Sequence, residues 1–201
     1  MKVGLYFGTY NPIHVGHLII ANHMANYTNL DQVWMVVTPR NPLKNKESLL
    51  PDYHRLEIVR RAIEDNDKLR VSDIEFKLEK PSYTAHTLAY LQDKYPGYEF
   101  ALIMGEDNLR TLHKWKNYET ILKNHSLVVY PRVLTEQEKT ESIPPPIKPE
   151  IHQHPNVNVI QAPIMKVSAS FIRRAIKEGK DVRYLLSEPV FKYVDEMNFY
   201  R

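Results

Sequence analysis

The hydrophobic pattern of the chain consists of short apolar runs separated by amphipathic stretches. The runs have the length and composition of buried strands and lie at residues 3–7, 32–37, 98–104, 125–130 and 157–160. An alternating segment at 71–76 predicts a further short strand or an extended edge. Because helical stretches follow most of these strands, the pattern predicts an α/β fold, with a Rossmann-like open parallel sheet flanked by helices.

The amphipathic stretches predict helices that each bury one face. They begin near residues 18, 52, 82, 118, 168 and 188. The residues expected to be buried include Leu88, Leu91 and Tyr95 in the third helix, Phe171, Ile172, Ala175 and Ile176 in the fifth, and Val190, Tyr193, Val194 and Met197 in the last. Ser82 or Thr84 can cap the third helix. The last helix shows only a buried stripe, which predicts packing and no ligand contact.

The length and composition predict a single domain over residues 1–201. With 43% apolar residues, a chain of 201 residues can bury a proper core. The composition changes at about 132–155, which is polar and rich in proline. That segment is too long for an ordinary connection, so it predicts a lid, a contact surface or a disordered loop. A helical part follows from about residue 168.

Charge and cysteine content narrow the function classes. The net charge is +3 with acids and bases mixed, which does not indicate a nucleic-acid partner. The absence of cysteine excludes a disulfide framework and a thiolate metal site. No apolar run has membrane-spanning length, and Met1 and Lys2 lead into a strand rather than a signal peptide. We expect a soluble cytoplasmic protein that binds neither membrane nor nucleic acid; a homo-oligomer is compatible with the sequence.

The turn after the first strand favours phosphate binding. It comprises Gly8, Thr9, Tyr10, Asn11, Pro12, Ile13, His14, Val15, Gly16 and His17, and a helix follows. In an open α/β sheet, ligands bind at such carboxyl ends of strands. The two glycines let the backbone bend sharply or let a ligand come close. The amino end of the helix offers N–H groups and a partial positive charge to an anion.

His14 and His17 lie three residues apart, which places both rings on one face of the helix's opening turn. Two imidazoles there can donate hydrogen bonds to one phosphate and favour the negative charge that develops during phosphoryl transfer. One alternative is two unrelated histidines in a solvated turn. Another is a zinc pair, although zinc histidines on a helix usually sit four apart and need further ligands nearby.

Basic residues follow the second strand, at the edge of the sheet that the first turn also faces. Arg40, Lys44 and Lys46 lie in this loop, where they can meet phosphates. A solvated basic loop is the alternative. Arg55, on the next helix, either points toward the loop or lies at the surface.

Two segments in the middle of the chain place ligand-binding groups at the ends of elements. The helix start at 82–88 offers N–H groups to a carboxylate or a phosphate, with ordinary capping as the alternative. Gly105, Glu106 and Asp107 follow a strand, where a carboxylate can accept hydrogen bonds from ribose hydroxyls. Trp115 is either a core residue or, between two lysines, a ring that stacks on a heteroaromatic ligand.

The helix that begins near residue 168 carries hydroxyls and guanidiniums at its start. Ser168 and Ser170 can cap this helix or hydrogen-bond a ligand. Arg173 or Arg174 supplies a fork of N–H donors suited to phosphate. From these residues alone, capping and ligand binding both stay open for the serines.

The residues at 8–17 resemble the G-[ST]-F-[DN]-P-x-H-x-G-H signature of nucleotidyltransferases with an H-x-G-H motif. Many members have a second glycine where Phe7 stands, and Phe is usual at the position of Tyr10. Neither change removes a phosphate-contacting group. The resemblance implies a nucleotidyltransferase-type fold. The residues that it assigns to ATP here are Gly8, Thr9, Tyr10, His14, Gly16 and His17.

Over its whole length the chain resembles the nicotinate-nucleotide adenylyltransferase family. Residues 82–88 are similar to S-Y-T-x-x-T-L, which implies that the main chain of Tyr83 and Thr84 holds a nicotinate carboxylate; Asp is common at His86, which receives no role. Residues 105–115 resemble G-x-D-x(4)-L-x-x-W, which implies that Gly105 and Asp107 meet adenosine and that Trp115 stacks on the nicotinate ring. Residues 167–173 resemble I-S-[ST]-[ST]-x-[IL]-R, which assigns Ser168 and Arg173 to ATP phosphates.

The basic loop departs from the family pattern at one position. Leu43 replaces the histidine of the common P-H-K, while Lys44 remains. The resemblance implies that Asn11 and Lys44 contact nicotinate mononucleotide. The catalytic residues that it implies are His14, His17, Lys44 and Arg173.

The implied reaction transfers the adenylyl group of ATP to nicotinate mononucleotide, giving deamido-NAD and pyrophosphate. The acceptor phosphate is already anionic, so the enzyme aligns the reactants and neutralises charge. Mg²⁺ is expected mainly on the ATP phosphates. The alternatives are an adenylyltransferase for nicotinamide mononucleotide or another phosphorylated acceptor such as phosphopantetheine, a non-catalytic nucleotide sensor, and a metal-binding regulator.

Overall fold

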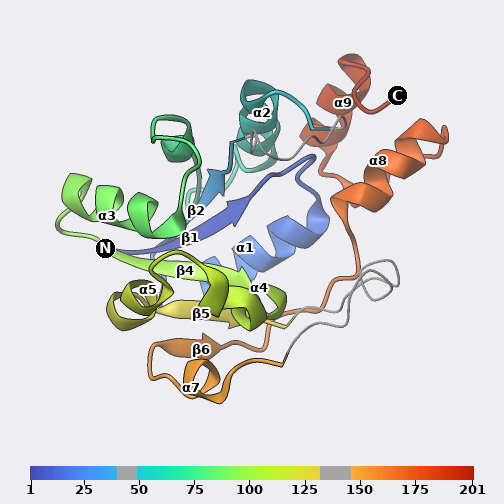
Figure 1. Ribbon diagram of the computed structural model, residues 1–201. Coiled ribbons are helices and arrows are strands. Elements are labelled where there is room, and N and C mark those ends of the chain that lie inside the picture. The colour runs from blue at the N-terminus through green and yellow to red at the C-terminus, as the bar shows by residue number, and fades with distance from the viewer. Residues whose placement is uncertain (40–48, 132–145) are drawn as a thin grey trace.

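The computed structural model describes residues 1–39, 49–131 and 146–201. Within these ranges the centre is a six-stranded sheet in which all neighbouring strands are parallel (Figure 1). The strands are β1 (Lys2–Gly8), β2 (Gln32–Val37), β3 (Leu69–Ser72), β4 (Glu99–Gly105), β5 (Leu127–Tyr130) and β6 (Val157–Val159). Their order is β3-β2-β1-β4-β5-β6. The predicted open parallel sheet is confirmed.

The central strands direct alternate side chains into two apolar clusters. In β2, Val33, Met35 and Val37 join one cluster, whereas Trp34 and Val36 join the other. Successive side chains of a strand point to opposite faces. Both faces are apolar because helices cover both, which is why these strands appear in the sequence as continuous apolar runs.

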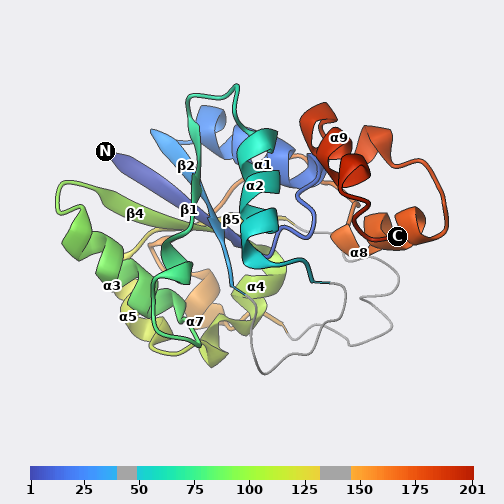
Figure 2. The ribbon, with the colours of Figure 1, turned by 90° about the horizontal axis from the view of Figure 1, so that it is seen from above.

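Helices cover the two faces in separate groups (Figure 2). One face carries α1 (Val15–Tyr27), α2 (Asp52–Ala62), α8 (Ala169–Lys177) and α9 (Glu188–Glu196). The other carries α3 (Thr84–Lys94), α4 (Glu106–Thr111), α5 (Tyr118–Asn124) and α7 (Pro149–His152). Short 3₁₀ turns occur at η1 (Ile74–Phe76), η2 (Leu112–Lys114) and η3 (Arg183–Leu185). This layering leaves the carboxyl edge of the sheet for a ligand.

The segment 71–76 is not one strand, because β3 ends at Ser72 and η1 follows. The N–H of Phe76 donates to the carbonyl of Asp73 at 2.9 Å, which is the local hydrogen bond of a 3₁₀ turn and not a strand pairing. The predicted caps of α3 are also wrong. Tyr83 occupies the cap position without a side-chain hydrogen bond among the described residues, because the Ser82 hydroxyl binds Glu75 instead.

Two residues assigned to buried helix faces are exposed. Phe171 is 47% exposed, because α8 turns Ile172 and Ala175 into the core, with Ile176 packed partly buried beside them. Met197 is 43% exposed, since α9 ends at Glu196. The buried stripes are therefore narrower than the apolar pattern predicted.

The described end of the predicted loop at 132–155 contains a short helix. Residues 149–152 form α7, with Pro149 in its first turn, where a proline is favoured. Ile151 is 1% exposed and lies in the cluster beneath α3 and α5. This end of the segment therefore packs into the core. The stretch 132–145 lies outside the described residues.

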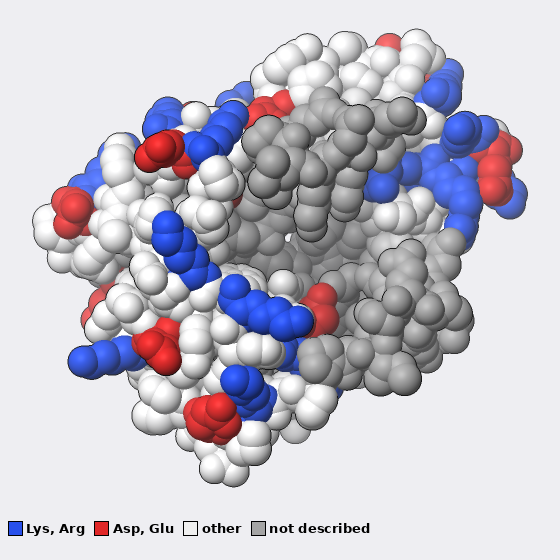
Figure 3. All heavy atoms as spheres, in the orientation of Figure 1, with Lys and Arg blue, Asp and Glu red and all other residues white. Residues whose placement is uncertain are grey.

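The surface mixes both signs of charge. Figure 3 shows Lys and Arg interspersed with Asp and Glu on the displayed face, with basic side chains gathered over α8. That helix carries Arg173, Arg174 and Lys177. In the described ranges, no helix combines the length and the hydropathy that a bilayer crossing requires.

Candidate active site

A cavity of about 360 Å³ lies where β1 ends. The sheet order reverses between β1 and β4, because the chain first builds β2 and β3 outward from β1 and then returns. Ligands of open α/β sheets bind outside the strands at this point. All the predicted site residues of the turn at 8–17 line the cavity, and so does Arg173 from α8. The structure thus brings the first and last sequence motifs together.

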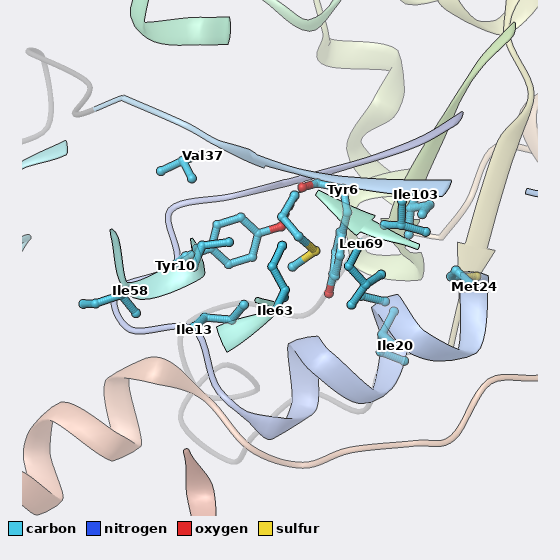
Figure 4. Close-up of a cluster of buried hydrophobic side chains, with 14 of the residues drawn as sticks. Tyr6, Tyr10, Ile13, Ile20, Met24, Val37, Ile58, Ile63, Leu69 and Ile103 are labelled. Atoms are coloured by element: carbon cyan, nitrogen blue, oxygen red, sulfur yellow. Dashed lines mark hydrogen bonds between the residues drawn. The ribbon is translucent and has the colours of Figure 1, made fainter. Parts of the chain in front are cut away.

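The turn begins with a close contact between Gly8 and Tyr10. Tyr10 has a φ of 46° and is 1% exposed. Its ring lies in the apolar cluster near Ile13 and Ile58 (Figure 4), and its hydroxyl donates to the carbonyl of Tyr6 at 2.5 Å. A Cβ on Gly8 would lie 2.8 Å from this ring. Burial raises the pKa of Tyr10, so its side chain anchors the turn and leaves the backbone to face a ligand.

His14 caps α1 with an extended backbone and is 5% exposed. Its ring stacks on His17, with 3.8 Å between ring centroids. A Cβ on Gly16 would lie 3.0 Å from His14 Nδ1. Glycine at this position therefore leaves the space that the His14 ring occupies. The pair predicted from spacing is therefore confirmed as one unit at the amino end of α1. The first turn of α1 carries no acidic side chain, so its partial positive charge is available to an anion.

A backbone hydrogen bond sets the tautomer of His17. The N–H of His14 donates to His17 Nδ1 at 3.2 Å. Because Nδ1 accepts, the proton of the neutral ring sits on Nε2. His17 therefore offers an N–H donor at the cavity that it lines.

Arg173 reaches across from α8 to the turn. Its Nη1 donates to the backbone oxygen of Asn11 at 2.8 Å, and its Nη2 donates to Ser170 Oγ at 3.1 Å. Burial lowers the pKa of Arg173. A guanidinium has five N–H donors, so Arg173 can bind a phosphate while it holds the turn.

Ser168 acts as the cap of α8, as the sequence allowed. Its Oγ accepts from the N–H of Phe171 at 3.2 Å. The cavity is lined by Ala169 and Ser170 rather than by Ser168 itself. Ser168 therefore shapes the helix start beside the cavity.

Arg55 binds four residues around the turn, a role that the sequence left undecided. It is fully buried. Its Nη1 donates to the carbonyls of Thr9 at 2.6 Å and Thr38 at 2.7 Å, its Nε donates to Leu50 at 3.1 Å, and its Nη2 pairs with Asp52 at 2.6 Å. Burial lowers the pKa of Arg55, and the Asp52 carboxylate opposes that shift. Arg55 therefore holds the end of β2 and Leu50 against the turn.

Three of the predicted acceptor residues, Tyr83, Thr84 and Trp115, form a second group away from the cavity lining, whereas Asn11 lines the cavity itself. Tyr83 and Thr84 stand at the start of α3, while Trp115 follows η2 and packs partly buried on the second cluster. The Lys116 ammonium lies 4.4 Å from the centre of the Tyr83 ring. This contact places the segment of Trp115 beside the start of α3.

Gly105 and Asp107 lie where β4 passes into α4. Gly105 caps the helix, and Asp107 is in its first turn. A Cβ on Gly105 would collide with Asp107 Oδ1, so glycine allows the carboxylate to fold over the strand end. The next residue, Asn108, lines the cavity. Asp107 thus lies at the same edge of the sheet as the turn.

Comparison with known proteins identifies the family. A model of the cytidylyltransferase-like family matches residues 5–175. A probable nicotinate-nucleotide adenylyltransferase of Flavobacterium johnsoniae is 59% identical to this chain, with 100% of both chains covered. This chain belongs to the nicotinate-nucleotide adenylyltransferase family. A member from Bacteroides fragilis is 44% identical and covers 96% of this chain and 90% of its own.

Solved structures share the fold of this family member. Nicotinic acid mononucleotide adenylyltransferase of Plasmodium falciparum, solved in complexes with APC and with NaAD, has a TM-score of 0.75 in both. The identities are 18% and 17%; both matches cover 99% of this chain and 96% and 97% of theirs. At these identities the likeness establishes the nucleotidyltransferase fold.

Part of the predicted site of this family member falls on residues 40–48, outside the described residues. Arg40, Lys44 and Lys46 belong to this part, as does the departure at Leu43. The described residues on either side are tied to the turn, because Arg55 binds both Thr38 and Leu50. The role of Lys44 stays a prediction.

Proposed function

We propose that this chain transfers the adenylyl group of ATP to nicotinate mononucleotide, giving deamido-NAD and pyrophosphate. One observation carries the proposal: the turn at 8–17, the start of α1 and Arg173 line a single cavity at the reversal point of the sheet. Such an arrangement concentrates N–H donors and positive charge on a phosphate chain. Relatives named for this activity over their full length support the assignment.

The donor side of the reaction is assigned to the cavity. Here we place the ATP phosphates against the start of α1, with His17 Nε2 and Arg173 donating to their oxygens. In the reaction an oxygen of the acceptor phosphate forms a bond to the α-phosphorus. The bond from that phosphorus to the bridging oxygen breaks, and pyrophosphate leaves with the electron pair. The side chains act by alignment and charge stabilisation, so no covalent enzyme intermediate is needed.

The acceptor side is assigned to the second group. A nicotinate carboxylate fits the amino end of α3, whose first turn carries no acidic side chain. Trp115 is partly buried and therefore has a fixed ring on which a pyridine can stack. Asn11 and Lys44 are proposed to meet the phosphate of the acceptor.

Mg²⁺ is proposed to arrive with the nucleotide. In the parts of the chain that the structure describes, no three His, Asp or Glu side chains gather as a metal site would require. The donor set of the cavity, with imidazoles and a guanidinium, fits anionic oxygens rather than a cation. Bound to the triphosphate, the ion would withdraw charge from the phosphates. His14, His17 and Arg173 would hold the phosphates beside it.

The test is product analysis with ATP, Mg²⁺ and nicotinate mononucleotide. The proposal predicts equal amounts of pyrophosphate and of a dinucleotide with the mass of deamido-NAD. A protein that binds ATP and yields neither product would be a nucleotide sensor, and the proposal would be rejected. Pyrophosphate formed only with phosphopantetheine would identify a different acceptor.

A further inference from the structure

The segment after α9 reaches the nucleotide-binding turn. Tyr200 follows α9 by four residues, and its hydroxyl donates to Asn11 Oδ1 at 2.8 Å. The contact joins positions 189 residues apart in the sequence. The sequence assigned the last helix to packing alone, so this hydrogen bond adds a role that the pattern did not predict.

Asn11 connects three other parts of the site. It is 3% exposed and lines the cavity. Its Oδ1 accepts both from Tyr200 and from the N–H of Leu50 at 3.2 Å. Its backbone oxygen accepts from Arg173. A displacement of Asn11 would therefore move the turn and Arg173 together.

The segment that carries Tyr200 is held in place through the preceding residue, Phe199. Phe199 packs edge-on against His54 and Tyr193, with centroids 4.7 and 5.6 Å away. The N–H of Phe199 bonds the carbonyl of Val194 at 3.0 Å. Burial raises the pKa of Tyr200, against the influence of Arg173 and Arg55, so the hydroxyl keeps its proton and donates. Tyr200 itself does not belong to the cavity lining among the described residues.

We propose that Tyr200 is a positioning residue, whose hydroxyl fixes Asn11 and thereby the geometry of the turn and of Arg173 around the ATP phosphates. The inference rests on the proposed function, because alignment matters only if the phosphates react there. Alignment acts on turnover more than on folding, since small misplacements of reacting groups are costly. Tyr200 acts through Asn11 and does not touch substrate.

The experiment compares Tyr200→Phe with the wild type and with Tyr184→Phe. The first variant keeps the ring and removes only the hydroxyl. Tyr184 is 89% exposed and serves as the matched control. We expect Tyr200→Phe to lower kcat about tenfold with a KM for ATP within about twofold of the wild type, because the buried Asn11 Oδ1 loses one of its two donors. Tyr184→Phe should leave kcat, KM and the thermal midpoint unchanged.

A double-mutant cycle separates positioning from general stability. If Tyr200 acts through Asn11, then adding Tyr200→Phe to Asn11→Ala should lower kcat by less than about twofold further. An unchanged kcat in Tyr200→Phe would overturn the proposal. So would a full tenfold further loss in the Asn11→Ala background, or a loss of folding in Tyr200→Phe that accounts for its lower rate.

The failure of the proposed function gives a different result. In that case the wild type itself forms no product, and the positioning role of Tyr200 is overturned together with the proposed function. When the positioning role alone fails, the wild type still forms both products and Tyr200→Phe forms them at the wild-type rate.

Discussion

At the scale of the residue, His17 shows how one backbone contact prepares a side chain for chemistry. Its Nδ1 accepts from the N–H of His14, which places the proton of the neutral ring on Nε2, the atom that we propose donates to a phosphate oxygen. We predict that His17→Ala lowers turnover by about 10²- to 10³-fold, the range measured for the loss of one donor to developing charge. Pyrophosphate release measures the rate. The matched control is His23→Ala on the same helix, which does not line the cavity.

The same substitution should leave the fold intact. The His17 contact with the backbone of His14 is one hydrogen bond at 3.2 Å, worth about 1 kcal/mol. Thermal unfolding should therefore shift by only a few degrees. Near-normal turnover in His17→Ala, or turnover equal to that of His23→Ala, would remove His17 from the proposed chemistry.

The role of a residue in the site could be predicted from the sequence where its partners lie nearby in the chain. The pairing of His14 and His17 and the need for glycine at positions 8 and 16 followed from sequence, because the partners lie within a few residues. The burial of Arg55 had a visible signal, since Ile58 and Val59 extend its face at helical spacing and are fully buried. The contact between Tyr200 and Asn11 had no signal in the sequence, because the two residues become neighbours only when the whole chain has folded.

At the scale of the element, Arg55 joins α2 to the ends of β1 and β2. Arg55→Met removes the donor from three carbonyls and leaves Asp52 without its buried partner. We predict a loss of about 3 kcal/mol or more in the free energy of unfolding, or roughly 6–12 °C in thermal midpoint. The control is Arg60→Met on the same helix. Arg60 is 57% exposed and pairs with Glu57, so its removal should cost under about 0.5 kcal/mol. Similar losses in both variants would contradict this role.

The first residues of α3 pack over a buried carboxyl group, that of Glu75, which accepts a hydrogen bond from Thr87. Glu75 is 3% exposed and accepts from Thr87 Oγ1 at 2.9 Å. Burial raises the pKa of Glu75, partly opposed by hydrogen bonds from Thr87 and Ser82. The folded state therefore favours the protonated form. The stability that this proton contributes is complete below the unfolded pKa of 4.5 and is lost as the pH rises through the folded value.

Glu75→Gln should remove this pH dependence. As the pH rises from about 4.5 through the raised pKa of folded Glu75, the thermal midpoint of the wild type should fall relative to that of Glu75→Gln. Glu79→Gln, at an exposed position of the following loop, should track the wild type. Parallel curves for the wild type and Glu75→Gln would show that this carboxyl does not titrate with folding in that range.

Elements were predictable where their apolar pattern was long. β1, β2 and β4 are fully apolar runs between covered faces, and their predicted bounds agree with the structure to within about two residues. The short helix α7 was missed, because four residues among prolines carry no periodicity. Its burial depends on Ile151 alone, which reaches a cluster built by distant helices.

At the scale of the whole molecule, the order of the strands sets the site. The reversal between β1 and β4 places the turn of β1 and the start of α4 at one edge, where Arg173 arrives from the other end of the chain. The sequence predicted the open sheet and the motifs at its edge. It could not predict that Tyr83, Thr84 and Trp115 form a separate group, because that separation depends on how α3 and η2 pack.

The most direct test of the account is the rate of pyrophosphate release with ATP and Mg²⁺, compared between nicotinate mononucleotide and nicotinamide mononucleotide. The amino end of α3 favours a carboxylate over an amide, because N–H donors bind an anionic acceptor about twice as strongly as a neutral one. We predict release that is at least about tenfold faster with the acid, the equivalent of about 1.4 kcal/mol. Equal rates would contradict the carboxylate site at Tyr83 and Thr84. No release with either acceptor would contradict the proposed reaction as a whole.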